Sequence, residues 1–164
     1  MTASRHRRAV LLVRRVPVPV DAAIAVLAQE PERVIGSHLG APWAASGLTA
    51  QLSVELPAGR QLARQVEVRF GPLLEDDDAL ALPLWWQATD HPQLFPTFDG
   101  GLELRGDGDG TELRLVGSYQ PPLGTLGRFA DGLVGHHVVT ASLDGFLAEV
   151  ATRLVAAVEP DPPD

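Results

Sequence analysis

Two adjacent histidines, His136 and His137, lie inside an otherwise apolar stretch, DGLVGHHVVT at 131–140. Histidine changes charge near neutral pH, so it can serve as a general base, a metal ligand or a polar anchor. On a helix, adjacent side chains point about 100° apart, whereas two metal ligands on one helix face need i, i+4 spacing. The chain also has no Cys, which excludes thiolate ligands. We therefore expect no metal and no cofactor.

His136 falls on the apolar side of a helical wheel drawn for residues 125–158, whereas His137 lies at the flank. Three roles stay open for His136. It could be a core histidine satisfied by a carbonyl or a water, a polar anchor for a ligand with Thr140 one turn further on, or a general base. The predicted apolar arc consists of Phe129, Leu133, His136, Thr140, Leu143, Leu147, Val150, Leu154 and Val158.

The predicted strands carry three further candidates. Arg64 interrupts an apolar strand face, so it either points inward toward a carboxylate of the protein or a ligand, or it is a strand-end arginine. Trp86 shares a face with the leucines before it and should line the core or a cavity, which directs Trp85 to the opposite face. Tyr119 shares a face with apolar residues, and its hydroxyl needs a partner that a cavity could supply.

Other polar motifs fit turns better than sites. Asp90 precedes His91 and could orient a base, but no nucleophile motif accompanies the pair, and a turn before a proline explains it. The acidic segments EDDD (75–78) and GDGDG (106–110) lack the spaced oxygen ligands and closing Glu of a calcium loop. We predict a loop for the first segment and a hairpin turn for the second.

Length and composition indicate a folded soluble protein. The 164 residues fit one domain, 45% of them are hydrophobic, and the formal net charge of −8 argues against nucleic acid as a partner. The apolar run AVLLV is too short for a signal peptide, and no run approaches the roughly 18 residues of a membrane span. We expect a cytoplasmic monomer or homodimer without integral membrane association. The basic N-terminal cluster (Arg5, Arg7, Arg8, Arg14 and Arg15) fits a solvated strand start or contact with an anionic surface.

The predicted elements give an α+β fold in the order β-α-α-β(5)-α. A strand over 7–18 has continuous apolar character and suits cover on both faces. Asp21 is a good N-cap for the helix that follows, and a second short helix comes next. Alternating residues then predict an antiparallel meander of about five strands, so the curved sheet has about six in all. One long helix over 125–158 is the element that can cover one sheet face. We expect one domain over 1–158 and a disordered tail over 159–164.

This layout resembles the START-like (SRPBCC) superfamily. The resemblance is carried by VPVDAAIAVLAQ near the start, LWWQATDHPQLFPTFDGGLEL in the middle and GSYQPPLGTLGRFADGLVGHHVVTASLDGFLAEVATRL at the end. The superfamily includes polyketide cyclases, aromatases, plant pollen allergens of the Bet v 1 type and lipid-transfer domains, and the chain looks most like actinobacterial members without an assigned function. The resemblance implies a helix-grip fold around an elongated apolar cavity. It also implies binding of lipids, sterols or polyketides.

We therefore expect a protein that binds a hydrophobic, lipid-like or polyketide-like small molecule between the sheet and the last helix. An enzyme of the cyclase, aromatase or dehydratase kind, with His136 or Tyr119 in proton transfer, is the alternative. A protein-interaction module with a collapsed cavity and an apolar patch near Trp85 or Trp43 is a second alternative. The expected ligand-lining residues are Arg64, Trp86, Tyr119, Phe129, Leu133, His136 and Thr140.

Overall fold

The computed structural model describes residues 7–35, 47–56, 60–76, 79–89, 97–120 and 132–159, with the backbone alone described at 47–56, 60–65, 76, 132–139 and 142. The strands are β1 (Arg8–Val16), β2 (Gly47–Leu56), β3 (Arg60–Phe70), β4 (Leu74–Asp76), β5 (Ala79–Ala88), β6 (Thr97–Asp107) and β7 (Gly110–Gln120). The helices are α1 (Val20–Gln29), α2 (Pro31–Ile35) and α3 (Gly132–Val158). None of the helices in these ranges is both long enough and apolar enough to cross a membrane.

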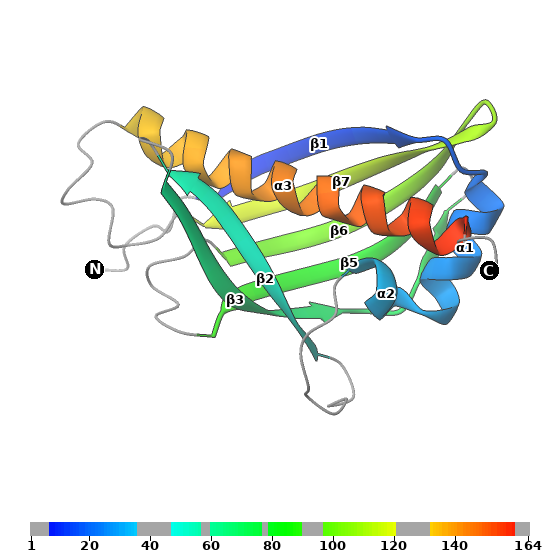
Figure 1. Cartoon of the computed structure of the whole chain (residues 1–164), viewed down its shortest axis with the longest axis horizontal. Coiled ribbons are helices and arrows are strands. Elements are labelled where there is room, and N and C mark those ends of the chain that lie inside the picture. The colour runs from blue at the N-terminus through cyan, green and yellow to red at the C-terminus, as the bar shows by residue number, and fades with distance from the viewer. Residues whose placement is uncertain are drawn as a thin grey trace, which may run out of the picture.

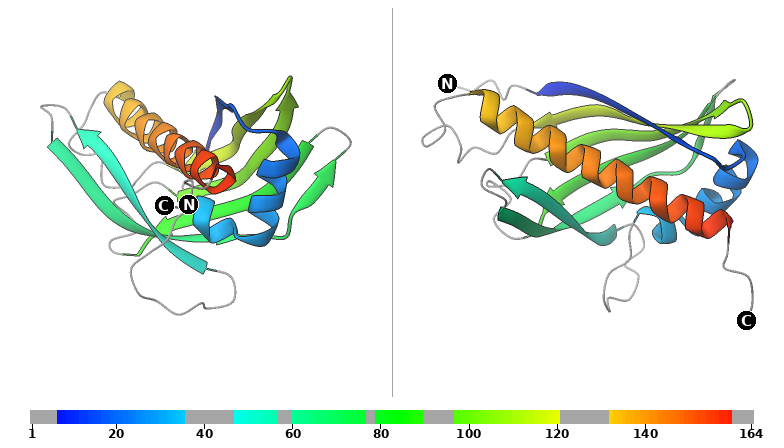
Figure 2. Two further views of the ribbon diagram at one scale, coloured as in Figure 1. Left: turned by 45° about the vertical axis from the view of Figure 1, so that its right-hand side comes forward. Right: turned by 45° about the horizontal axis from the view of Figure 1, so that its top comes forward.

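The strands form one antiparallel sheet in the order β1-β7-β6-β5-β3-β2, with β4 paired to β5 off this path. Figure 1 shows α3 lying diagonally across the concave face of the sheet, with α1 and α2 beside the C-terminal end of α3. Both views in Figure 2 show the sheet curving around the helix. The backbone of α3 comes close to the edge strands β1 and β2. The predicted curved sheet and long covering helix are confirmed.

The first strand differs from its prediction. β1 is an edge strand that pairs with β7, and Leu11 and Val13 on its outer face are 54% and 46% exposed. Val10, Leu12 and Val16 on its other face pack against the core. The continuous apolar run therefore does not indicate cover on both faces, because the helix covers the sheet on its concave side alone.

Two local predictions also need correction. The predicted acidic loop contributes its first residues to β4, which pairs in register with the start of β5 through Glu75 and Leu80. Asp21 is not the N-cap of α1: Pro19 holds that position and Asp21 lies in the first turn, where a carboxylate still favours the helix dipole.

The predicted hairpin at GDGDG is confirmed. β6 and β7 pair from Thr97↔Gln120 to Asp107↔Gly110, which leaves a two-residue turn. Gly108 opens this turn with a φ of 63°, a left-handed conformation that favours glycine.

A pair of glycines marks a close approach of β6 and β7. Gly100 on β6 and Gly117 on β7 lie directly opposite each other on the concave side. A Cβ at Gly100 would lie 2.1 Å from the Val116 carbonyl oxygen, and one at Gly117 would lie 2.7 Å from the Gly100 Cα. The Phe98 ring also lies 2.8 Å from the position of a Gly100 Cβ. The two strands approach so closely here that no side chain fits.

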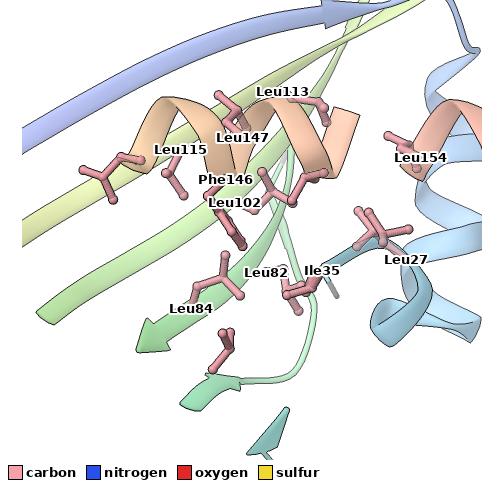
Figure 3. Close-up of a cluster of buried hydrophobic side chains, with 14 of the residues drawn as sticks. Leu27, Ile35, Leu82, Leu84, Leu102, Leu113, Leu115, Phe146, Leu147 and Leu154 are labelled. Carbon is pink, nitrogen blue, oxygen red and sulfur yellow. The ribbon is translucent and has the colours of Figure 1, made fainter. Parts of the chain in front are cut away.

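The core lies between the sheet and the second half of α3. Figure 3 shows Phe146 and Leu147 of α3 beside leucines of the sheet, with Leu27 of α1 and Ile35 of α2 completing the cluster. Among the described side chains of α3, the buried ones are Leu143, Phe146, Leu147, Val150 and Leu154. The predicted apolar arc is thus confirmed from Leu143 to Leu154.

Candidate functional site

An aromatic row crosses the concave side of the sheet. We use this name for Trp86 on β5, Phe98 on β6 and Tyr119 on β7, which are direct neighbours in the strand register (Trp86↔Phe98 and Phe98↔Tyr119). All are at most 1% exposed. The register extends the row to Val68 on β3 and Arg8 on β1.

The position of the row in the fold follows from strand direction. β1 ends at Val16 and leads into α1, so Val16 and its partner Thr111 mark the end of the sheet near α1 and α2. Arg8, Tyr119 and their neighbours lie at the opposite end of these strands. In Figures 1 and 2 this end of the sheet lies toward the N-terminal half of α3.

Trp86 is held by aromatic contacts, and among the described residues its indole nitrogen makes no polar contact. Its indole stacks on Phe98, with ring centroids 4.4 Å apart and an interplanar angle of 20°. Phe146 of α3 packs against it at 5.0 Å and 52°. Within the described part of the chain, the buried indole Nε1 has no hydrogen-bond acceptor. A buried donor without a partner costs about 1–3 kcal/mol, so this nitrogen is a candidate binding group.

Two arginines of β1 lie on the concave side of the sheet. Arg14 donates a hydrogen bond to Asp144 of α3 at 2.8 Å, which ties the edge strand to the helix. Arg8 stands opposite Tyr119 at the end of the row and is exposed. The row therefore runs from a buried neutral donor at Trp86 to a solvated cation at Arg8.

The structure places some of the predicted site residues together and leaves others undescribed. Trp86 and Tyr119 both lie in the aromatic row, with Phe98 between them. Thr140 is partly buried on α3, on the helix face that continues to Leu143 and Leu147. For Arg64, Leu133 and His136 the backbone alone is described. Arg64 lies in β3, where it pairs with Leu52 of β2. Leu133 and His136 lie in the first turns of α3. Phe129, together with Asp90, His91 and Trp43, lies outside the described residues.

The sequence analysis missed four residues of this region. Phe98 and Phe146 form the contacts of the indole, and Gly100 and Gly117 make room for the Phe98 ring. Phe98 could have been found by its two-residue alternation with Leu102 and Leu104. The glycine pair could not, because sequence spacing does not tell which residues of two strands are opposite each other.

The convex face of the sheet carries a different chemistry. Trp85 points to this side, as predicted, and the Arg69 guanidinium lies 5.3 Å from its ring centroid. Glu103 and Glu112 lie within 4.0 Å of Arg114. The basic N-terminal cluster is largely paired too, through Arg7 with Asp99, Arg14 with Asp144, and Arg15 with Asp107. Within the described ranges no three acidic, histidine or cysteine side chains gather as a metal site would require.

Comparison with known sequences gives limited information. No family model matches the chain. A porphobilinogen deaminase from Desulforudis audaxviator is 31% identical over 169 residues, an alignment that covers 99% of this chain and 50% of that protein. The chain thus spans half the length of this curated relative.

Comparison with solved structures is informative about the fold. A protein from Thermus thermophilus matches with a TM-score of 0.54 at 15% identity, covering 93% of this chain and all (100%) of that one. A protein from Rhizobium loti matches with a TM-score of 0.53 at 16% identity, covering 90% and 97%. The Zhui aromatase/cyclase from a Streptomyces species matches with a TM-score of 0.52 at 16% identity, covering 97% and 100%. The curved sheet closed on a long C-terminal helix, together with these matches over nearly whole chains, shows that this protein has an α+β helix-grip fold.

Proposed function

We propose that this protein binds a hydrophobic small molecule between the sheet and the N-terminal half of α3. The observation that carries the proposal is the extent of the apolar concave surface. It continues beyond the contact of Phe146 with Trp86, through Phe98, to Tyr119 and Val10 at the far end of the strands. Removing apolar ligand surface from water contributes about 25 cal/mol per Å² to the binding free energy. The entropy that the ligand and protein lose on association reduces this gain.

The second half of α3 limits where such a ligand fits. This half of α3 packs against the short helices α1 and α2 as well as the sheet, and Leu27 and Ile35 of these helices belong to the same core cluster, so that part of the interior is already filled by protein. The ligand site would therefore lie on the side of Phe146 that leads to the first turns of α3. Thr140 is partly buried at the boundary between these two regions.

The Streptomyces aromatase/cyclase shares this fold, which keeps an enzyme of that kind as the alternative. Enzymatic proton transfer needs titratable groups near one point. On the concave side of β1, β5, β6 and β7, the ionisable side chains are Arg8, Arg14 and Tyr119, and Arg14 is engaged with Asp144. The carboxylates of these strands lie on the convex face, among them Glu103 and Glu112. Within these four strands, this distribution favours binding over catalysis.

The binding proposal can be tested on the full chain. Purified protein would be examined by native mass spectrometry and organic extraction, and then titrated with 1-aminoanthracene, an apolar fluorescent probe. We expect a co-purified apolar molecule or saturable probe binding. Thr140→Phe enlarges a side chain on the face that continues to Leu143, so it should weaken probe binding about tenfold or more. Ala141→Phe, at the exposed neighbouring position, is the matched control and should leave binding unchanged.

The result that overturns the proposal is a clean apo mass combined with no saturable probe binding. Equal effects of the two substitutions would place any bound probe elsewhere on the molecule. Circular dichroism of both variants checks that α3 is intact. A molecule extracted from the natural protein supports the proposal without reference to either variant.

A further inference from the structure

The indole of Trp86 is a rigidly held donor. The side chain is 1% exposed, Phe98 stacks on its ring and Phe146 packs against it from α3. A stacked face leaves the ring edge, where Nε1 lies, as the part of the indole that can take a polar partner. Buried donors in native proteins are almost always paired, yet no protein acceptor reaches Nε1 from the described residues.

The surroundings of Trp86 indicate what kind of acceptor fits. Its neighbours on the concave side are apolar: Leu84 and Ala88 on the same strand, and Val68 on β3, all buried. Arg14 is paired with Asp144, and Arg8 stands at the far end of the register row, on β1, with β6 and β7 between it and β5. Among the described side chains none supplies a counter-charge beside Trp86, and burying a carboxylate without one is far more costly than burying a neutral oxygen.

We propose that Trp86 Nε1 donates a hydrogen bond to an uncharged oxygen, such as a ketone or ester carbonyl, of the hydrophobic molecule that the protein binds. This inference rests on the proposed function and narrows its ligand class. It assigns apolar contact to Phe98 and Phe146 and orientation to the indole nitrogen. A pure hydrocarbon would leave the donor unpaired, and a carboxylate would be rejected from this position.

Three rigid probes of nearly equal shape separate these classes: 9-fluorenone, fluorene and fluorene-9-carboxylate. Their affinities would be measured by displacement of 1-aminoanthracene from the full chain. We expect 9-fluorenone to bind about tenfold more tightly than either of the others, the size expected for one buried hydrogen bond. In Trp86→Phe, which keeps an aromatic ring but removes the N–H, the ratio of 9-fluorenone affinity to fluorene affinity should fall to about one.

Trp85→Phe is the matched control, because Trp85 is the same residue type on the same strand and faces the other side of the sheet. It should keep the preference for 9-fluorenone. Nuclear magnetic resonance of the ¹⁵N-labelled natural protein adds a test that needs no folded variant. The Trp86 indole proton should move downfield with 9-fluorenone and shift much less with fluorene.

Equal affinities for 9-fluorenone and fluorene would overturn the proposal, as would a preference that survives Trp86→Phe. Cross-relaxation between the indole proton and water in the 9-fluorenone complex would also overturn it, since the donor would then serve a water. In each case 1-aminoanthracene still binds, so the proposed function stands. Failure of 1-aminoanthracene itself to bind, with a clean apo mass, overturns the proposed function instead.

Discussion

The two glycines beside the aromatic row show how single residues let two strands approach closely. A Cβ at position 100 would meet the Val116 carbonyl at 2.1 Å, and a backbone atom cannot swing aside as a side chain can. We predict that Gly100→Ala lowers the free energy of unfolding by roughly 3 kcal/mol, through forced displacement of β6 from β7. Chemical denaturation followed by circular dichroism measures this difference.

The control is Gly145→Ala on α3. Gly145 is exposed, and nothing lies within 4 Å of a Cβ built there. Alanine should therefore stabilise the protein by about 0.5–1 kcal/mol, because a glycine inside a helix has more conformational freedom to lose. A loss of unfolding free energy for Gly100→Ala together with a gain for Gly145→Ala would show that the strain arises between β6 and β7. A loss much smaller than about 3 kcal/mol at Gly100 would show that the two strands can separate enough to accept a methyl group.

Thr111 is a buried polar residue whose role is structural. Its hydroxyl donates a hydrogen bond of 2.7 Å to the Val18 carbonyl and so fastens the start of β7 to the segment that leads from β1 to α1. Thr111→Val keeps the shape but leaves this carbonyl without its hydroxyl partner. We predict a loss of about 1–3 kcal/mol in unfolding free energy.

Thr152→Val provides the comparison for Thr111. Its hydroxyl also donates to a carbonyl, that of Ala148, but at an exposed position on α3. Water can replace this bond, so the change should stay within about 0.5 kcal/mol. Similar losses of unfolding free energy for Thr111→Val and Thr152→Val would contradict the prediction that a buried hydrogen bond contributes more than an exposed one.

At the scale of elements, the ion pair between Arg14 and Asp144 joins the edge strand β1 to the middle of α3. Its side chains are 37% and 51% exposed, so solvent weakens their attraction. We predict a coupling free energy of roughly 0.2–1 kcal/mol from a double-mutant cycle with Arg14→Gln and Asp144→Asn. The coupling should shrink in 1 M NaCl, where the Debye length is about 3 Å.

A pair within one element is the control for that cycle. Arg153 and Glu149 lie one turn apart on α3 at 2.9 Å and connect no second element. Both pairs should show small coupling energies in the equilibrium cycle. Of the two pairs, probe affinity should respond only to Arg14–Asp144, because this pair connects α3 to β1. Equal effects of the two ion pairs on probe affinity would show that the Arg14–Asp144 pair has no specific influence on the ligand site.

Elements with one clear period were predictable from the sequence. The alternation of β5 and β7 and the helical arc from Leu143 to Leu154 each place their residues on the observed buried face. β4 was not predictable, because a three-residue strand ending in acidic residues has no period to detect. The edge position of β1 was not predictable either, because its apolar residues do not tell that Leu11 and Val13 face solvent.

At the scale of the whole molecule, the candidate site depends on contacts between residues far apart in the sequence. The sequence placed Trp86 and Tyr119 on inward faces, but it could not show that Phe98 stands between them or that Phe146 reaches the indole from α3. These neighbours follow from the strand order β7-β6-β5, which periodicity does not contain. For the same reason no spacing argument could reveal that the indole Nε1 lacks a partner among the described residues. That property belongs to the assembled core.

The same long-range pairing should govern how the chain folds. β6 and β7 are joined by a two-residue turn, whereas β1 must find β7 across most of the sequence, bringing Arg8 opposite Tyr119. Loop closure makes such distant pairing slow, so we predict refolding in milliseconds to seconds with the hairpin formed early. Leu104→Ala in the hairpin should mainly slow folding, with a φ-value above about 0.5. Val16→Ala at the end of β1 should mainly speed unfolding, with a φ-value below about 0.3. Stopped-flow tryptophan fluorescence measures both, and the reverse order would mean that β1 docks before the hairpin closes.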